Sequence, residues 1–537
     1  WVRNLNGVFT YVKQFGDHSI NATLGTERQQ RQLKATALGA ENITSADQRI
    51  GEPNLDDVFV FVSRNFPEFR IQSYFGRANY AYKDKYLLGV SFRTDGASVF
   101  GEEERWGSFP AISAGWIISE ENFASGLDAF NLLKLRASFG RTGNADIPDV
   151  LQDSYVNWPA YGSGGGFILN GLGVPDITWE NINSFDAAVD FGLFENRISG
   201  SIGYYQQNIT DMLLQVPIPQ SQGVLFGPSS VWTNFGELRN RGIELQISSV
   251  NIDRGNFTWR TDFNITTNQN EVIRLDESLT DNVSGIINGQ TITQADGQLG
   301  AFFMPLYAGI DPATGYEMIY EVDQQRFQET GETVLTGNIV TATNANVATN
   351  RYIHEDKNGL PTFFGGISNT VSYKDISLSV QFTYQGGNYL FDGSEAARVV
   401  PNGINALSAD YIGNYWTETN TTAKYPRPSI DGLTREGQQL SSGHSRYLYK
   451  ADLLRLNFVQ LSYNLPVSKL GINGVVKSAR VYLNAMNLAT FTPFPGLDPE
   501  VANFDSNRQN RNLRQGFIGS VPFPQVQTVT GGVTLKF

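Results

Sequence analysis

The histidines are the first residues to consider, because imidazole can bind a metal or act as a general base. The chain contains three, His18, His354 and His444, and no cysteine. The three lie far apart, and none belongs to an HExxH pattern, the spacing that brings two imidazoles to one zinc ion. The lack of cysteine removes thiolate ligands and cysteine nucleophiles. The sequence therefore predicts no metal site, no cofactor and no catalytic triad.

Acidic and glycine-rich segments are the next candidates, as cation or phosphate sites. The acidic ones are residues 102–104, Asp56 with Asp57, and DPATGYE at 311–317. A calcium site needs about six to eight oxygens at defined spacing, which none of them supplies. We interpret 102–104 as a solvated loop tip. The segment GSGGGF at 162–167 lacks the lysine and the following helix of a phosphate-binding loop, so it is expected to be a flexible loop.

The elements that would carry these residues are strands. Leu88, Val90 and Phe92 alternate with smaller or polar residues, which is the pattern of a strand with one apolar and one polar face. About 15 such segments occur, and no long amphipathic helix is evident. Further examples cover 133–139, 185–191, 198–204, 257–265, 376–384 and 481–485.

The connections between these strands alternate between short and long. Short ones lie near 15–18, 82–86, 193–197, 251–256 and 373–375, with moderate ones near 119–131 and 465–476. Long ones lie near 32–68, 143–182, 208–235, 272–363, 388–450 and 489–525, and the brief segment 96–107 falls on the long side. A soluble sandwich has no reason for this asymmetry, whereas an outer-membrane barrel has short periplasmic turns and long outer loops. The pattern predicts a transmembrane barrel whose apolar rows face lipid.

Composition agrees with this interpretation. Charged residues make up 17% and aromatic residues 12% of the chain, and the net charge of -13 argues against a nucleic-acid partner. No apolar run reaches the roughly 18 residues that a transmembrane helix needs. The last segment, VTGGVTLKF, ends in Phe537, an aromatic terminus typical of outer-membrane barrels and read by their assembly machinery. An odd strand count beginning with WVRNLNGVFTYVKQFG predicts missing upstream strands, because single-chain bacterial barrels have an even number.

Several segments resemble one family in order along the chain. The most specific is NYAYKDKYLLGVSFRTDGASVFGEEERWGSFPAISAGWIISEENF at 79–123. Others are LLKLRASFGRTGN (132–144), ITWENINSFDAAVDFGLFENRISGSIGYYQQNITDMLL (177–214), NRGIELQIS (240–248), GLPTFFGGISNTVSYKDISLSVQFTYQGGNYLFDG (359–393), LLRLNFVQLSYNLP (453–466), RVYLNAMNLATFTPFPGLDPE (480–500) and VPFPQVQTVTGGVTLKF (521–537). The chain is similar to the SusC-like (RagA/SusC) branch of TonB-dependent outer-membrane transporters of Gram-negative bacteria.

The resemblance implies an all-β fold, a transmembrane antiparallel β-barrel of 22 strands in the whole transporter. Residues 1–537 would be its C-terminal part, about strands 8 to 22, with long extracellular loops, while the N-terminal plug and first strands are missing. It also implies partners: a SusD-like surface lipoprotein that acts as a lid, TonB–ExbB–ExbD acting through the missing plug, the N-terminal part that completes the barrel, and the lipid bilayer.

The resemblance implies active import of an oligomeric nutrient, first an oligosaccharide, without covalent chemistry. A SusC-like barrel that imports peptides or serves a secretion or surface assembly is the alternative, and a passive porin or an outer-membrane enzyme is a weaker one. Sugars stack on aromatic faces, so six loop aromatics are candidate contacts. They could instead form the aromatic girdle, pack loops together or contact the lid. They are Trp158, Tyr161, Trp232, Tyr411, Tyr415 and Trp416.

Overall fold

The computed structural model describes most of the 537 residues. The described residues are 1–33, 35–41, 59–65, 68–147, 155–157, 160–161, 164–165, 168–171, 173–217, 230–234, 236–275, 285–399, 407–428, 433–435, 438–439, 443–471, 474–500, 515–518 and 524–537.

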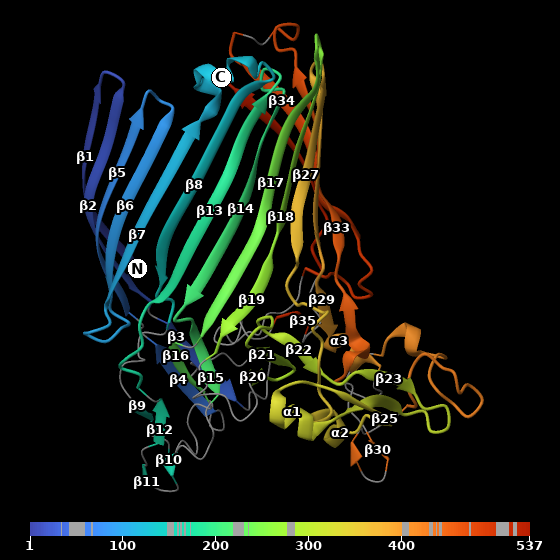
Figure 1. Ribbon diagram of the computed structural model, residues 1–537. Coiled ribbons are helices and arrows are strands. Elements are labelled where there is room, and N and C mark those ends of the chain that lie inside the picture. The colour runs from blue at the N-terminus through green and yellow to red at the C-terminus, as the bar shows by residue number, and fades with distance from the viewer. Residues whose placement is uncertain are drawn as a thin grey trace. The chain divides into compact units, whose positions relative to one another are not determined.

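One sheet of 16 strands is the main element (Figure 1). A short strand, β19 (Gln269–Arg274), pairs beside the others with β17, and the remaining 15 follow one another in sequence order. They are β1 (Val2–Phe15), β2 (His18–Gln32), β5 (Glu68–Tyr82), β6 (Tyr86–Ala97), β7 (Trp106–Ile117), β8 (Phe130–Asn144), β13 (Glu180–Leu193), β14 (Ile198–Thr210), β17 (Glu237–Arg254), β18 (Phe257–Thr267), β27 (Phe363–Tyr373), β28 (Ile376–Gly386), β33 (Leu453–Leu465), β34 (Ser478–Phe491) and β36 (Thr528–Lys536). The expected number of strands is thereby confirmed.

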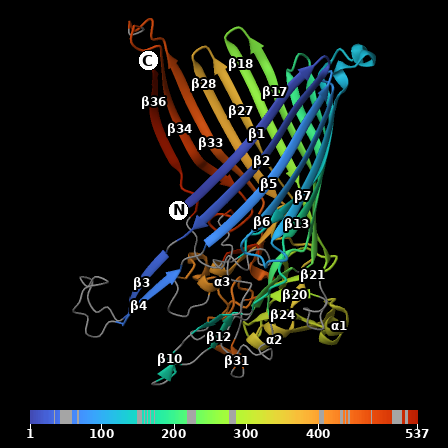
Figure 2. The same cartoon turned by 90° about the vertical axis from the view of Figure 1, so that its left-hand side faces the viewer.

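The expected alternation of short and long connections is also confirmed. Tight turns join β17 to β18 and β27 to β28, whereas β18 to β27 and β28 to β33 are joined by long folded segments. The tight turns use left-handed backbone, with φ of 58° at Gly255 and 52° at Lys374. Figure 2 shows β1, β2, β5 and β6 side by side, and their registers are antiparallel.

The apolar rows lie on an exposed face of the strands. In β6, Leu88, Val90 and Phe92 are 45%, 44% and 52% exposed, while Gly89 and Ser91 between them and Arg93 after them are less exposed. A water-facing surface rarely carries such rows, and a lipid-facing one requires them. The prediction that these rows face lipid therefore agrees with their exposure.

The long connections contain further small elements. The strands are β3 (Ala35–Glu41), β4 (Phe59–Asn65), β9 (Tyr155–Asn157), β10 (Ala160–Tyr161), β11 (Gly164–Gly165), β12 (Ile168–Gly171), β15 (Leu213–Pro217), β16 (Ser230–Asn234), β20 (Gly285–Asn288), β21 (Thr291–Gln294), β22 (Ala301–Met304), β23 (Tyr307–Ile310), β24 (Glu317–Val322), β25 (Leu335–Thr341), β26 (Tyr352–Ile353), β29 (Tyr389–Asp392), β30 (Leu433–Arg435), β31 (Gln438–Gln439), β32 (Leu448–Lys450) and β35 (Phe517–Ile518).

The helices are short. The α-helices are α1 (Gln324–Thr330), α2 (Asn344–Thr349) and α3 (Gly393–Arg398), and the 3-10 turns are Ile118–Glu120, Asn122–Gly126, Ala409–Tyr411 and Ser445–Tyr447. Asp323, Thr343 and Asp392 cap the three α-helices by accepting backbone N–H bonds. Within the described ranges, no helix is long and apolar enough to cross a membrane.

Contacts divide the chain into two units. The first comprises Trp1–Gly115, Ser138–Ser184 and Ile209–Phe235, and the second Trp116–Ala137, Phe185–Asn208 and Gly236–Phe537. In the second unit, the described parts of residues 285–362 and 387–452 share a core cluster that includes Phe302, Phe391 and Tyr447. We call these described parts the loop body. Figure 1 shows β20, β21 and β22 with α1 and α2 beyond the ends of β17 and β18.

Candidate binding site in the loop body

The six loop aromatics predicted as contacts separate into two groups. Trp158 lies outside the described residues, and only the backbone of Tyr161, in β10, is described. Trp232, in β16, is half-buried and packs against the core cluster of the first unit, which includes Phe100 and Trp179. The Trp232 side chain therefore packs the connection between β14 and β17 against the end of the sheet.

The other three come together inside the loop body. Tyr411 stacks on Tyr415 with 5.3 Å between ring centroids, and both pack in a cluster with Tyr425. Trp416 donates its indole N–H to the carbonyl of Pro312 at 3.0 Å. Tyr411 and Trp416 are only 3% and 7% exposed, so in this structure they join two connections rather than line an open surface.

A buried ionic contact lies beside these rings, and no pattern in the sequence points to it. His444 Nε2 lies 3.1 Å from Glu317 Oε2, across 127 residues, and Arg446 Nη1 lies 3.4 Å from Glu317 Oε1. The imidazole is stacked between the rings of Tyr307 and Tyr447. Burial by itself raises the pKa of Glu317, but the charges and hydrogen bonds of its partners outweigh it and lower that pKa. The contact joins the first connection of the loop body, which contains Glu317, to the second, which contains His444 and Arg446.

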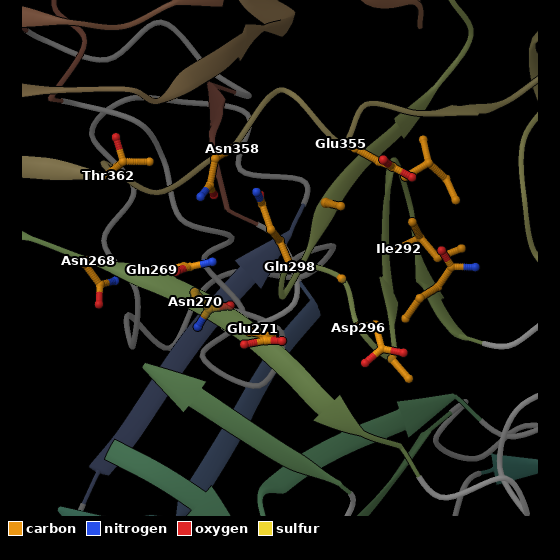
Figure 3. Close-up of a pocket in the computed structure, with 15 residues that line it drawn as sticks. Asn268, Gln269, Asn270, Glu271, Ile292, Asp296, Gln298, Glu355, Asn358 and Thr362 are labelled. Atoms are coloured by element: carbon orange, nitrogen blue, oxygen red, sulfur yellow. The ribbon is translucent and has the colours of Figure 1, made fainter. Parts of the chain in front are cut away.

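A polar pocket opens at the boundary between the sheet and the loop body (Figure 3). Its volume is about 590 Å³, within the range of small-ligand sites. Figure 3 shows Asn268 to Glu271 following one another along one wall, with Glu355 and Asn358 on a facing segment. The lining residues are Asn268, Gln269, Asn270, Glu271, Ile292, Gln294, Ala295, Asp296, Gly297, Gln298, Ala301, Ile353, Glu355, Asn358 and Thr362.

Hydrogen bonds hold the sheet-side wall of the pocket. Asn268 Oδ1 accepts from the Tyr205 hydroxyl at 2.8 Å, and its backbone N–H donates to Thr362 at 2.9 Å. Asn270 Oδ1 accepts from the backbone of Leu299 at 3.1 Å. These bonds fix the orientation of the two amide side chains in the wall.

Other lining groups retain unused acceptors. Oε2 of Glu271 and Oε1 of Gln298 are buried and accept no hydrogen bond from the part of the chain that the structure describes. The closest cations to Glu271 are Arg239 and Arg241, each 3.9 Å from Oε2. A buried acceptor without a partner costs free energy, and an enclosed water molecule is the usual donor to such an oxygen.

The neighbouring histidine adds no positive charge to the pocket near neutral pH. Burial lowers the pKa of His354 to about 4, aided by the charge of Lys357, so the ring is neutral at pH 7. Its Nε2 lies 3.1 Å from the Met304 carbonyl oxygen, which a neutral ring bonds by donating that N–H. Glu355, the next residue, therefore faces the pocket without a cationic histidine beside it.

The acidic segments that were candidate cation sites in the sequence differ in their structural surroundings. Residues 102–104 form an exposed turn, as interpreted, and Asp56 and Asp57 lie outside the described residues. Asp311 uses both carboxylate oxygens within its own turn, accepting from Ala313 N at 3.0 Å and Thr314 Oγ1 at 2.6 Å. Where residues are described, no group of three or more histidine or acidic side chains could hold a metal ion. Phe537, after β36, is 68% exposed.

Segments that carry the family resemblance meet in the core of the first unit. Trp179 packs on Phe100 and Phe109, with ring centroids at 5.1 Å and 5.3 Å, and donates to the Arg105 carbonyl at 3.0 Å. The following residue, Glu180, accepts from Asn144 Nδ2 and from a backbone N–H, both at 2.9 Å. The resembling segments thus include contacts that fix strand ends, not a catalytic constellation.

Comparisons with known proteins agree with this architecture. Residues 2–488 match the family model "TonB dependent receptor-like, beta-barrel". The TonB-dependent receptor P26 of Formosa agariphila is 30% identical over 99% of this chain and 53% of its own length. The TonB-dependent receptor SusC of Bacteroides thetaiotaomicron is 26% identical over 98% of this chain and 49% of its own.

A solved structure described as that of the RagAB peptide transporter matches with a TM-score of 0.79 and 25% identity, over 100% of this chain and 56% of that one. The chain thus spans about half the length of the relatives it matches. The TM-score shows that the antiparallel sheet of this chain has the fold of that structure. The chain belongs to the TonB-dependent receptor-like β-barrel family, as a SusC-like protein of the outer membrane.

Proposed function

We propose that this protein is the C-terminal part of the barrel of a TonB-dependent importer that takes up an oligomeric nutrient, with an oligosaccharide as the first candidate cargo. The observation that carries the proposal is the family match over 2–488, on a sheet whose alternate connections are long. Long outer loops form the recognition surface in outer-membrane barrels. No catalytic role is proposed.

The two edge strands of the sheet are evidence for a partner that completes the barrel. In the described chain β1 pairs only with β2, and β36 only with β34. An open edge in hydrocarbon leaves backbone N–H and C=O groups without partners, at several kcal/mol each. We therefore propose that strands from the N-terminal part of the same transporter pair with both edges. The plug of that part would contact TonB–ExbB–ExbD.

A SusD-like surface lipoprotein is the proposed lid on the loops. The support is the similarity to SusC and to a solved RagAB structure, which are proteins of this same branch. The loop aromatics Trp158, Tyr161 and Trp232 remain proposed cargo contacts. Tyr411, Tyr415 and Trp416 also remain proposed contacts. Tyr411 and Trp416 would reach cargo only if the loop body opened, because both are buried in it, whereas Tyr415 is only partly buried.

Purification of the chain from solubilised outer membranes, followed by mass spectrometry of what accompanies it, tests the proposal. We expect equal amounts of a lipoprotein lid and of peptides from a plug. Uptake of labelled cargo should stop when TonB is deleted. A set of secretion or surface proteins without a lid would instead establish the alternative of an assembly component, and steady conductance in planar bilayers without a plug would establish a porin.

Peptide import is the second candidate function. The observation that favours it is the solved structure at 25% identity, which is described as a peptide transporter. Growth on defined oligosaccharides and on defined oligopeptides, with and without the gene, separates the two cargo classes. Loss of growth on peptides alone would replace the oligosaccharide as the cargo.

A further inference from the structure

We propose that the apolar face of the sheet binds one glycerophospholipid from the membrane leaflet nearer the short turns. Two observations carry the proposal. One is a hydrogen-bonded group of polar side chains on that face of β17, β18 and β27, and the other is an apolar hollow on the same face of β28, β33, β34 and β36. These strands follow one another in this order within the second unit (Figure 2). The proposal concerns the barrel wall and does not depend on the cargo.

The polar group lies among residues that face lipid. Thr261 on β18 and Asn369 on β27 are direct register partners. The next pair on each side along this face is apolar, and these pairs are Trp259–Val371 and Phe263–Ile367. A polar side chain in contact with hydrocarbon costs free energy unless it is hydrogen-bonded. Polar residues on a membrane-facing row are therefore candidates for a functional contact.

The hydrogen bonds of the polar group run in one direction and end at Asn369. Ser249 donates to Asn251 Oδ1 at 2.8 Å, and Asn251 Nδ2 donates to the Thr261 hydroxyl at 2.7 Å. Thr261 in turn donates to Asn369 Oδ1 at 2.7 Å, and Trp259 Nε1 lies 3.0 Å from the same oxygen. Because an indole nitrogen only donates, this atom of Asn369 must be the acceptor. The two N–H groups of Asn369 Nδ2 then bond no residue in the described part of the chain.

The depth of Asn369 in the membrane indicates which acceptor meets these N–H groups. Phe257 and Tyr373 pair at the turn ends of β18 and β27, and Trp259 follows two residues further on. Such aromatic residues mark the membrane interface. Asn369 lies two residues beyond Trp259, or roughly 5 Å deeper for a strand tilted by about 40°. The ester carbonyls of glycerophospholipids lie at this boundary between headgroups and hydrocarbon, and they accept hydrogen bonds without donating any.

The apolar hollow would hold an acyl chain of the same lipid. Its volume is about 680 Å³, and its lining includes Leu461, Leu483 and Gly531. Gly531 leaves it open, because a side chain there would meet no atom within 4 Å, whereas Gly532 on the opposite face is covered by the Tyr482 ring. An unfilled hollow loses dispersion contacts on its lining, so hydrocarbon of the bilayer is expected to fill it.

The register of the sheet connects the polar group to the hollow. One row of register partners crosses from the first to the second, and it consists of Trp259, Val371, Leu378, Leu461, Leu483 and Gly531. Val371 is two residues from the turn end of β27, whereas Leu461 is four from that of β33, so the row lies deeper in the bilayer at the hollow. The two strands are two spacings apart, or roughly 10 Å. An acyl chain that spans half of the roughly 30 Å hydrocarbon core can cover this distance.

Two lipids with the same hydrocarbon chains test the ester contact. One is a diester phosphatidylethanolamine, and the other is its diether analogue, which lacks both carbonyls. The delipidated complete transporter in detergent is titrated with each lipid, and native mass spectrometry measures the fraction that carries one lipid. We expect the diester to bind about two- to tenfold more tightly than the diether, as one hydrogen bond would give.

Two variants locate the site. Asn369→Leu should lower the affinity for the diester to that for the diether and should not weaken binding of the diether, because it removes only the donor. Gly531→Leu should weaken both lipids at least about fivefold, because its side chain fills the hollow. The matched controls are Gln381→Leu, which removes an amide from the opposite face of β28, and Gly7→Leu, which adds the same side chain to β1 at the other end of the strand order. Both controls should bind like the unmodified protein.

Three outcomes overturn the proposal. Equal binding of the diester and the diether by the unmodified protein would remove the ester contact. Unchanged binding in both Asn369→Leu and Gly531→Leu would leave only unselective lipid at the barrel wall. Dissociation of a dimer by these two variants, with lipid binding unaltered, would assign the face to a second copy of the chain. If Asn369→Leu fails to fold, the ratio of the two lipids and the Gly531→Leu variant still decide the question.

Discussion

Arg455 and Asp498 form a buried ion pair, with 2.6 Å between Nη2 and Oδ1. The side chains are 3% and 4% exposed, and the same guanidinium nitrogen lies 2.8 Å from Oε2 of Glu500. Arg455 lies on β33, and the two acids lie on the connection between β34 and β36. Two segments quoted for the family resemblance, LLRLNFVQLSYNLP and RVYLNAMNLATFTPFPGLDPE, are therefore joined by this pair.

The first prediction concerns the loss of this pair. Arg455→Ala should lower the free energy of unfolding by about 3–5 kcal/mol, because it leaves Asp498 buried without a counter-ion. Arg455→Lys should recover only part of this, since lysine cannot present a guanidinium fork. Urea unfolding of the complete transporter in detergent measures both. Arg326→Ala removes an exposed pair with Glu332 and should cost at most about 1 kcal/mol; equal losses at both sites would contradict the prediction.

The second prediction concerns acid and the loop body. The pKa of Glu317 in the folded state is lowered from 4.5, so its ionised form contributes stability above about pH 4.5 that is lost as the pH falls through the folded-state pKa. Hydrogen exchange of residues 307–322 should therefore accelerate in that acidic window. Glu317→Gln should exchange faster already at neutral pH and show a smaller change on acidification. A pH response as large in the variant as in the unmodified protein would show that another group is responsible.

The third prediction concerns the core of the first unit. Trp179→Ala should destabilise it by about 3–5 kcal/mol, because a large buried ring and its cavity-filling contacts are lost. Trp179→Phe keeps a ring against Phe100 and Phe109 and gives up the indole bond to Arg105, so its loss should be smaller. The stability of both variants is measured as the temperature at which half of the heated protein has changed its electrophoretic mobility. A phenylalanine variant as unstable as the alanine variant would place the main contribution in the hydrogen bond.

The fourth prediction distinguishes the two faces of β34. Leu483 is 53% exposed on the apolar row, and Asn484 follows it on the opposite face. Leu483→Lys should cost about 2–4 kcal/mol if it lies near the bilayer midplane, because a lipid-facing charge is desolvated. Asn484→Lys should cost much less. Refolding yield and unfolding midpoint in lipid vesicles compare the two, and a reversed order would mean that the apolar row does not face lipid.

The sequence predicted the sheet well, for a physical reason. Residues such as Leu88, Val90 and Phe92 alternate because a barrel strand has two solvents, and that periodicity is local. The lengths of the connections are also local information. Strand number and the alternation of short and long connections could therefore be predicted, and both agree with the structure.

The candidate site could not be predicted in the same way. The run from Asn268 to Glu271 is polar on both faces, so its role as a pocket wall depends on segments that fold against it. Glu317 and His444 stand 127 residues apart and share no motif. Trp416 has the residue type of a sugar platform, yet it packs on the turn at Pro312. Such contacts depend on how two long connections pack against each other. The alternation of apolar and polar residues along a strand carries no information about that packing.

The packing of these two connections against each other also has a consequence for the order in which the hairpin and the Glu317–His444 contact are expected to form. Closing a chain of 127 residues between Glu317 and His444 carries an entropic cost. The hairpin of β27 and β28 reduces that cost, because it brings the end of the first connection and the start of the second together. Thr362 N–H donates to the Gly386 carbonyl at 2.9 Å at that junction. A one-residue slip of the hairpin would turn its side chains to the wrong face and offset the junction. We therefore expect the buried contact to form after the hairpin and only when its register is correct, so that its formation would report native strand assembly.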